Sequence, residues 1–167
     1  MLYNTKKGKQ GAAMKVAGIA LVALVASVLS FTSCTLESSD NGDLDGYWHL
    51  ESIDSLATGT TVDLSQKRIF WGVEFKLISA KEFDHGKERM YFRFEQTSDS
   101  LKITKVYLDH GHQDNGDNGG DIPLDDVTDA LRYYGINEIP EGFAKEALSG
   151  SKMILRSKTL RLKFKKF

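Results

Sequence analysis

Cysteine is nearly absent from this sequence, in which Cys34 is the only one among 167 residues. A single cysteine cannot form a disulfide bond within its own chain, so internal disulfides are excluded. In an exported protein such a residue is a free thiol, half of an intermolecular disulfide or a site of modification. The sequence around Cys34 has to distinguish these cases.

A surplus of basic charge is absent as well. The chain has 22 Lys and Arg residues and 23 Asp and Glu residues, and four of the lysines lie within residues 1–33, where no acidic residue occurs. Residues 34–167 therefore carry 18 basic and 23 acidic residues, a net charge of −5. Binding to nucleic acid needs a basic patch that neutralises phosphates, so we expect no nucleic-acid partner.

Catalytic motifs are missing too. The sequence contains no G-x-S-x-G, and the histidines fall at outward-facing strand positions or in loops: His49, His85, His110 and His112. An enzyme needs a nucleophile with a base, or paired carboxylates, in one cleft. We therefore predict neither an enzymatic activity nor a cofactor.

The longest apolar run, residues 16–31, is short for a membrane span. It has 16 residues, whereas a spanning helix needs about 20. Four lysines precede the run, and acidic residues follow it in place of a basic stop-transfer cluster. This order is typical of a signal peptide, which we predict over residues 1–33.

Cys34 follows this run in the sequence Phe31-Thr32-Ser33-Cys34. The pattern resembles the lipobox of bacterial lipoproteins, in which a diacylglyceryl group is attached to the cysteine thiol before cleavage. Phe31 stands where Leu is usual, a departure that lipoproteins of Bacteroidota-type bacteria tolerate. The resemblance implies an outer-membrane lipoprotein, facing the periplasm or the cell surface, with acyl chains such as palmitate on Cys34. A signal peptide cleaved elsewhere, leaving Cys34 a free thiol, is the alternative.

The chain from Cys34 onward consists of two segments that differ in composition. Residues 34–46 are polar and acidic and contain glycine, which predicts a flexible tether with nothing to bury. Residues 47–167 have enough apolar side chains and enough length for one hydrophobic core. We therefore expect a signal peptide over residues 1–33, a tether over 34–46 and one domain over 47–167.

Alternating apolar and polar residues predict that this domain is mainly antiparallel β. A short strand opens it at Gly46–Leu50, and the clearest pattern, Ile69–Leu77, predicts one nine-residue strand with its apolar face inward. Residues 90–103 predict a hairpin, and a change of apolar phase after it predicts a β-bulge near Thr104 and Lys105. Two C-terminal strands are expected over residues 151–157 and 159–165.

A loop and a helical insert are expected between these strands. Residues 109–121 contain no large apolar side chain, which predicts an exposed loop. Apolar residues three and four apart predict a helix over residues 123–134, with Asp121 as N-cap and Gly135 at its end. A second short helix is expected over residues 140–148, so the insert covers residues 123–148.

The whole pattern resembles the lipocalin-like lipoprotein domains of Bacteroidota. The resemblance is carried by the lipobox, the opening Gly46-Tyr47-Trp48, the strand meander and the closing hairpin from Met153 to Phe167. It implies a lipocalin-like barrel in which the opening Trp closes one end. Six strands are clear against the eight of a full lipocalin, so closure of the barrel and an internal cavity are left open.

Inward-facing aromatic residues are the first candidate site. In a closed barrel they would line a cavity for a small apolar ligand or simply form the core, since eight strands enclose either packed side chains or one ligand. The candidates for ligand contact are Trp48, Trp71, Phe75, Phe92 and Phe94.

The long loop is the second candidate site. His110 and His112 are two residues apart and can face one metal ion, with Asp114 and Asp117 as further oxygen ligands. From Asp114 onward the loop also partly matches a calcium loop, with Gly at its third position and Asp125 where Glu is usual. An acidic loop without metal is the alternative.

These observations predict an outer-membrane-anchored lipoprotein with a non-catalytic, lipocalin-like binding or interaction domain. Its expected partners are the membrane, through the lipid, and either a small apolar ligand or an outer-membrane protein. The alternatives are a structural lipoprotein that docks a partner through a packed barrel, and a calcium-dependent module built on residues 109–125.

Overall fold

Alternating apolar residues give most of the domain the extended conformation. The computed structural model describes residues 38–84, 86–111 and 120–167, and Ser39–Phe167 form one compact unit. The elements in order are η1 (Gly42–Leu44), β1 (Gly46–Ser55), β2 (Thr61–Asp63), β3 (Ile69–Glu74), β4 (Leu77–Glu82), β5 (Met90–Gln96), β6 (Ser100–Leu108), β7 (Ile122–Leu124), α2 (Asp129–Tyr133), β8 (Glu141–Leu148), β9 (Lys152–Arg156) and β10 (Leu160–Lys166).

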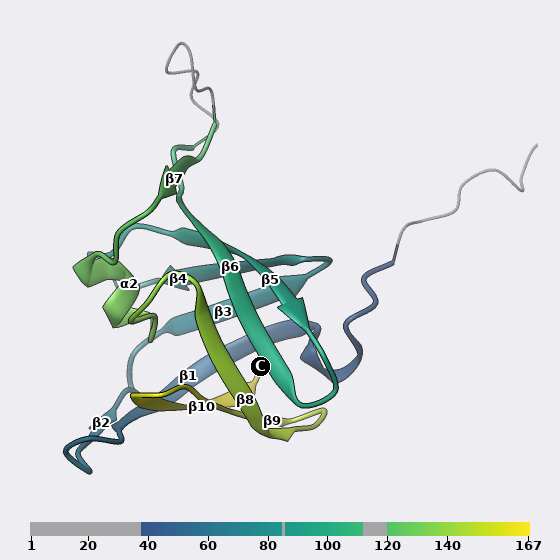
Figure 1. The fold of residues 1–167 in the computed structure, drawn as a ribbon, viewed down its shortest axis with the longest axis vertical. Coiled ribbons are helices and arrows are strands. Elements are labelled where there is room, and N and C mark those ends of the chain that lie inside the picture. The colour runs from purple at the N-terminus through teal and green to yellow at the C-terminus, as the bar shows by residue number, and fades with distance from the viewer. Residues whose placement is uncertain (1–37, 85, 112–119) are drawn as a thin grey trace, which may run out of the picture. The chain divides into compact units, whose positions relative to one another are not determined.

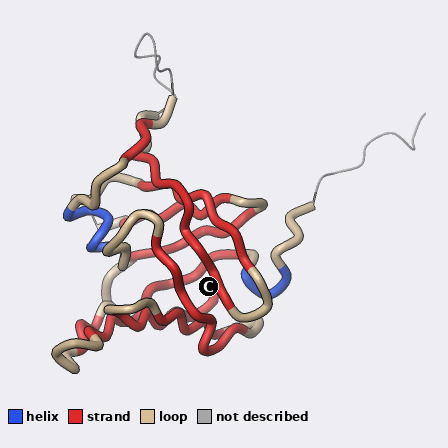
Figure 2. Tube along the Cα trace, in the orientation of Figure 1, coloured by secondary structure: helices blue, strands red, loops and turns tan. Residues whose placement is uncertain are grey.

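Eight of these strands close into an antiparallel barrel, whose course can be followed in Figures 1 and 2. The order is β1, β3, β4, β5, β6, β8, β9 and β10, and β10 pairs with β1 to complete the circle. Outside the barrel order, β2 pairs with the C-terminal part of β1, and β7 pairs antiparallel with the C-terminal part of β6. The prediction of a mainly antiparallel lipocalin-like barrel is confirmed, and closure, left open by the sequence, is complete.

The predicted single strand over Ile69–Leu77 is wrong, because the chain turns back inside it. Strand β3 ends at Glu74, and β4 begins at Leu77 after a two-residue turn. Phe75 takes a φ of 53° there, as two-residue hairpin turns require of their first residue. The turn leaves the Phe75 side chain 46% exposed, outside the core that the alternation had assigned to it.

The helical insert is shorter than predicted. Its only α-helix among the described residues is α2, whose N-cap is Thr128 and not Asp121: Thr128 Oγ1 accepts a hydrogen bond from Leu131 N at 3.3 Å. The predicted end at Gly135 is confirmed, with a φ of 87°. The second helix, expected over residues 140–148, is wrong, because this segment is strand β8 between β6 and β9.

The predicted β-bulge is confirmed at Thr104. Arg93 pairs with Lys105 and Phe94 with Ile103, so Thr104 is the extra residue of β6. The bulge moves the inward face from Leu101 and Ile103 to Val106, which keeps apolar residues inside on both sides of it.

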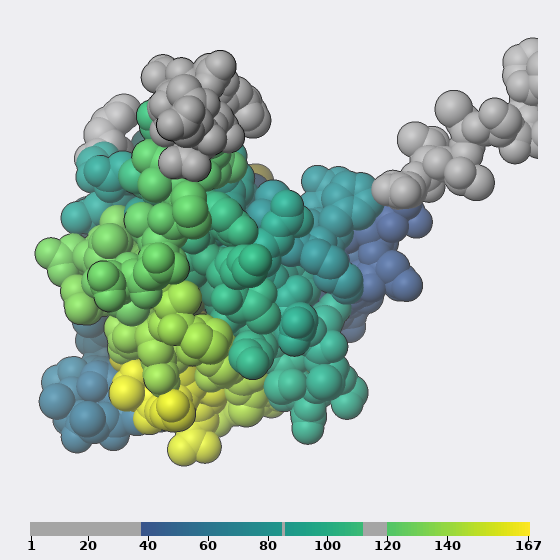
Figure 3. Space-filling model, turned by 45° about the horizontal axis from the view of Figure 1, so that its top comes forward, coloured from purple at the N-terminus to yellow at the C-terminus, as the bar shows by residue number. Residues whose placement is uncertain are grey.

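The core fills the barrel and continues under the helix. Trp71 lies near its centre, with ring centroids of Phe92, Phe143 and Phe164 at 5.6, 6.4 and 5.0 Å. Leu131 of α2 and the adjacent Tyr134 are fully buried. In the space-filling view, the light-green segment that carries β7 and α2 lies against the teal strands of the barrel (Figure 3).

The described part of the predicted tether is packed against the barrel. Leu44 is fully buried and Asn41 is 6% exposed. The carbonyl of Leu44 accepts a hydrogen bond from Trp48 Nε1 at 2.8 Å, so Trp48 and η1 together close this end. The prediction that this stretch has nothing to bury is therefore wrong from Ser39 onward.

Candidate functional site

Four of the five aromatic candidates lie in the packed core. Trp48, Trp71 and Phe92 have no exposed surface, and Phe94 is 3% exposed. A cavity of water size would expose the side chains that line it, so none adjoins the three fully buried rings. Trp71 Nε1 has no hydrogen-bond partner among the described residues, but no room for a ligand lies beside it. Ligand contact by these residues stays a prediction for which the structure offers no space.

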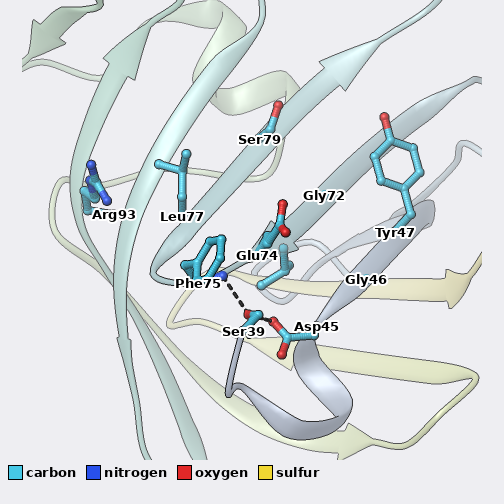
Figure 4. A pocket seen from close by; sticks show the side chains of 11 residues that line it. Ser39, Asp45, Gly46, Tyr47, Gly72, Glu74, Phe75, Leu77, Ser79 and Arg93 are labelled. Carbon is cyan, nitrogen blue, oxygen red and sulfur yellow. Dashed lines mark hydrogen bonds between the residues drawn. The ribbon is translucent and has the colours of Figure 1, made fainter. Parts of the chain in front are cut away.

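A groove lies on the outside of the barrel, across strands β1, β3, β4 and β5. In its floor, Gly72 of β3 pairs with Tyr47 of β1 on one side and with Ser79 of β4 on the other. Gly72 and Ser79 are small, whereas the groove's other residues include the large side chains of Tyr47, Leu77 and Arg93. The resulting hollow, which we call the outer groove, has a volume of about 660 Å³ (Figure 4).

Gly72 is required for this arrangement. A Cβ atom at position 72 would lie 2.8 Å from Cε2 of Tyr47, because the Tyr47 ring leans over the glycine. The same ring stacks on Phe70 of β3 with centroids 5.1 Å apart. Tyr47 therefore forms a fixed wall of the groove while it remains 38% exposed.

Two charged side chains of the outer groove have no partner among the residues that the structure describes. Arg93 and Glu74 are exposed, and neither side chain forms a hydrogen bond or ion pair with another described residue. Arg93 also lies opposite Lys105 in the β5–β6 ladder, where like charges repel. The groove thus combines apolar walls with an exposed cation and an exposed anion, which suits a ligand that has an apolar body and a polar group.

Phe75 and Asp45 form the end of the groove at the β3–β4 turn. Phe75, the fifth aromatic candidate, lines the outer groove and not the barrel interior. Burial acts to raise the pKa of Asp45, but hydrogen bonds from Ser39 and Asn41 outweigh it and hold that pKa below its ordinary value. Asp45 is therefore a stable carboxylate at neutral pH.

A second hollow, of about 470 Å³, lies on the other side of Tyr47. Its aromatic wall is built around Phe70, whose ring lies 5.9 Å from Phe83 and 5.6 Å from Phe167. Lys81 Nζ lies 4.4 Å from the centroid of the Phe83 ring, and Phe167 is 90% exposed. We call Tyr47, Phe70, Phe83 and Phe167 the aromatic patch.

His49 is held in place at the edge of this patch. Its Nδ1 lies 2.6 Å from Glu51 Oε1, and its Nε2 lies 2.5 Å from the carbonyl oxygen of Lys67. Both ring nitrogens are thus engaged by the protein, and the ring packs 5.0 Å from Phe70. This histidine supports the patch and has no free nitrogen for a metal or a proton transfer.

The patch and the groove were missed because their aromatic residues occupy the outward phase of the strands. Tyr47 and Phe70 fall between the inward residues of β1 and β3, where the pattern predicts solvent-facing side chains. The available signal was that these outward positions hold aromatic and not charged residues. Clustered aromatic side chains on a surface mark an interaction site.

Much of the predicted metal site lies outside the described residues, as His112, Asp114 and Asp117 do, and Cys34 lies outside them too. His110 is described, and its backbone N–H donates to Asp121 Oδ1 at 3.2 Å. Within residues 38–84, 86–111 and 120–167, no group of three or more His, Cys, Asp and Glu side chains could hold a metal ion. The metal prediction stays untested.

No helix within those same ranges is long and apolar enough to cross a membrane.

An eight-stranded antiparallel barrel with a short helix beside it and an aromatic residue at its closed end is a lipocalin-like architecture. The model of the family described as "Lipocalin-like domain" matches residues 29–167, and the chain belongs to this family. The resemblance noted in the sequence is thereby confirmed.

Two solved structures share the fold. A lipocalin-like protein from Bacteroides uniformis ATCC 8492 is 23% identical, with a TM-score of 0.52, and the match covers 75% of this chain and all of that one. An uncharacterized protein from Bacteroides eggerthii DSM 20697 is 20% identical, with a TM-score of 0.51, and the match covers 74% of this chain and 98% of that one. At these identities the likeness shows the fold alone. No curated protein matches the chain.

Proposed function

We propose that this chain is a membrane-anchored, non-catalytic binding protein that uses the outside of its barrel. One contrast carries the proposal: the rings of Trp71 and Phe92 have no exposed surface, whereas Tyr47 and Phe75 remain exposed beside a hollow of about 660 Å³. The lipocalin-like family membership supports a binding domain. The exposed charges of Arg93 and Glu74 support a ligand with an apolar body and a polar or charged group.

Anchoring through Cys34 is the second part of the proposal. It is supported by the signal-peptide pattern and the lipobox-like sequence that ends at Cys34, and it implies a position at the outer membrane. Several acyl chains make such an anchor stable, since one chain alone binds reversibly. Labelled palmitate should enter the parent chain and not Cys34→Ser, and label in both would refute the anchor.

Amide chemical shifts test binding on the outside. We expect a panel of small amphiphilic compounds to shift the amide resonances around Tyr47, Ser79 and Arg93. Ser79→Trp should fill the outer groove and abolish the shifts. Val62→Trp places the same ring on an exposed position of β2, outside the groove, and should leave the shifts intact. Shifts centred on Trp71 and Phe92 would overturn the proposal.

A protein partner on the aromatic patch is the second candidate. Phe167 exposes 90% of its surface next to Phe70 and Phe83, and aromatic residues are enriched in protein interfaces. A photo-crosslinker in place of Phe167 should then capture one defined protein in cells, and the capture should be lost on Phe70→Ala. Capture unchanged by Phe70→Ala would exclude the patch as the cause.

A further inference from the structure

The segment from Ser39 to Asp45, which we call the latch, is tied firmly to the barrel. Ser39 Oγ donates to Asp45 Oδ1 at 2.5 Å and accepts from the backbone N–H of Phe75 at 2.6 Å, as Figure 4 shows. The backbone N–H of Asn41 donates to Asp45 Oδ2 at 2.9 Å. The latch therefore fixes Ser39 directly beside the β3–β4 turn.

Asn41 connects the latch to two further strands. Its Nδ2 donates to Asp45 Oδ1 at 2.7 Å and to the carbonyl of Phe75. Its Oδ1 accepts from Lys76 Nζ at 2.9 Å and from Gln96 Nε2 at 3.2 Å. With Leu44 fully buried as well, the latch is part of the folded domain and cannot serve as a spacer.

Few residues separate the proposed lipid from the latch. Five residue steps separate Cys34 from Ser39, and an extended chain covers at most about 3.6 Å per residue. Whatever path these residues follow, Ser39 can lie no more than about 18 Å from Cys34. An acylated Cys34 would therefore hold the β3–β4 turn near the membrane surface.

The two ends of the barrel lie at different distances from the latch. Phe75 stands at the tip of the β3–β4 turn, 46% exposed, next to Ser39. Val62 of β2 is 56% exposed and pairs with Ile53, seven residues along β1 from Gly46. At about 3.3 Å per residue, Val62 lies about 23 Å from Gly46 along the direction of the strand. In Figure 1 the blue η1 end and β2 lie on opposite sides of the barrel.

We infer that the barrel end formed by the latch and the β3–β4 turn rests on a lipid bilayer, with the Phe75 ring in the interface. The inference depends on the proposed lipid anchor. Phe is among the apolar residues that membrane-surface segments bury at the boundary between headgroups and acyl chains. Around this end Asp40, Asp43 and Glu74 are exposed, and so are Lys76 and Arg93. Because this end has no surplus of basic charge, apolar contact and not attraction to anionic lipid drives the association.

Fluorescence quenching in vesicles tests the inference. The full lipidated chain is purified from cells, and mass spectrometry verifies the lipid on Cys34 before reconstitution into phosphatidylcholine vesicles with brominated acyl chains. Phe75→Trp should add emission that is blue-shifted and quenched by the bromine. Val62→Trp should add emission that is neither blue-shifted nor quenched. Equal quenching of both variants, or of neither, would overturn the inference.

A measurement on the parent chain removes any dependence on these variants. A phospholipid with a photoactivatable diazirine on its acyl chain should label peptides that contain Phe75 and spare those that contain Val62. Labelling of both, or of Val62 alone, would contradict the inference while leaving the anchor standing. Absence of lipid on Cys34 would instead refute the anchor, and the inference with it.

Discussion

Truncation of Phe92 separates a packed core from a ligand cavity. Phe92 has no exposed surface, and its ring lies 5.6 Å from that of Trp71. Phe→Ala in a packed core costs about 3 to 5 kcal/mol, because burial is lost and a cavity remains. With a urea m value of about 2 kcal/mol per M for a small domain, Phe92→Ala should lower the midpoint of unfolding by about 2 M. A ring that borders a preformed cavity would cost much less.

Phe75→Ala is the matched control, because both residues are aromatic candidates from the same sequence pattern. Phe75 is 46% exposed on a turn, so its truncation should change the free energy of unfolding by about 0.5 kcal/mol or less. Urea unfolding of residues 39–167, followed by far-ultraviolet circular dichroism, measures both variants. If Phe92→Ala costs no more than Phe75→Ala, the packed interior is wrong.

Three further perturbations test individual contacts. Gly135→Ala should destabilise the domain by about 1 to 3 kcal/mol in urea unfolding, because the φ of 87° disfavours a side chain and its Cβ would lie 2.7 Å from Leu162 Cδ2; an unchanged midpoint would contradict this. The lowered pKa of Asp45 stabilises the folded state above about pH 4, and this contribution is lost as the pH falls through the lowered pKa. The protection of the latch amides, measured as exchange relative to the intrinsic rate at each pH, should therefore fall in acid in the parent and lose this dependence in Asp45→Asn. Burial raises the pKa of Tyr134 to about 12, so stability should decline as the pH rises from about 10 to 12, and the decline should be weaker in Tyr134→Phe.

The strands that alternate cleanly were predictable from the sequence. The hairpin of β5 and β6 and the bulge at Thr104 follow from the alternating positions of four apolar residues, Phe92, Phe94, Leu101 and Ile103. Such residues form the core whichever strands they pair with, so their burial needs no knowledge of the fold. The family resemblance then supplied the barrel.

The elements that were predicted wrongly are those whose conformation depends on tertiary contacts. Phe75 continues the alternation of β3, and nothing local reveals that it occupies a turn with a positive φ, since such turns favour Gly or Asn. Strand β8 holds Ala144 and Ala147, which favour a helix, but pairing with β6 and β9 on both sides overrides that preference.

The outer groove could not be foreseen for a related reason. Its floor requires Gly72 and Ser79 to be neighbours on adjacent strands, and this depends on the register set by the Phe75 turn. With one continuous strand over Ile69–Leu77 the two residues would lie far apart. The aromatic nature of Tyr47 and Phe70 at outward positions was the one local sign of the proposed binding surface.

Xenon uptake by a crystal of residues 39–167 distinguishes a packed barrel from one with an internal ligand cavity. Xenon enters apolar cavities that are large enough to hold it and leaves packed cores empty. A filled barrel that binds through its outside should show no xenon between the Trp71, Phe92 and Phe164 rings. An ordered xenon atom at that position would reveal an internal ligand cavity and contradict the account.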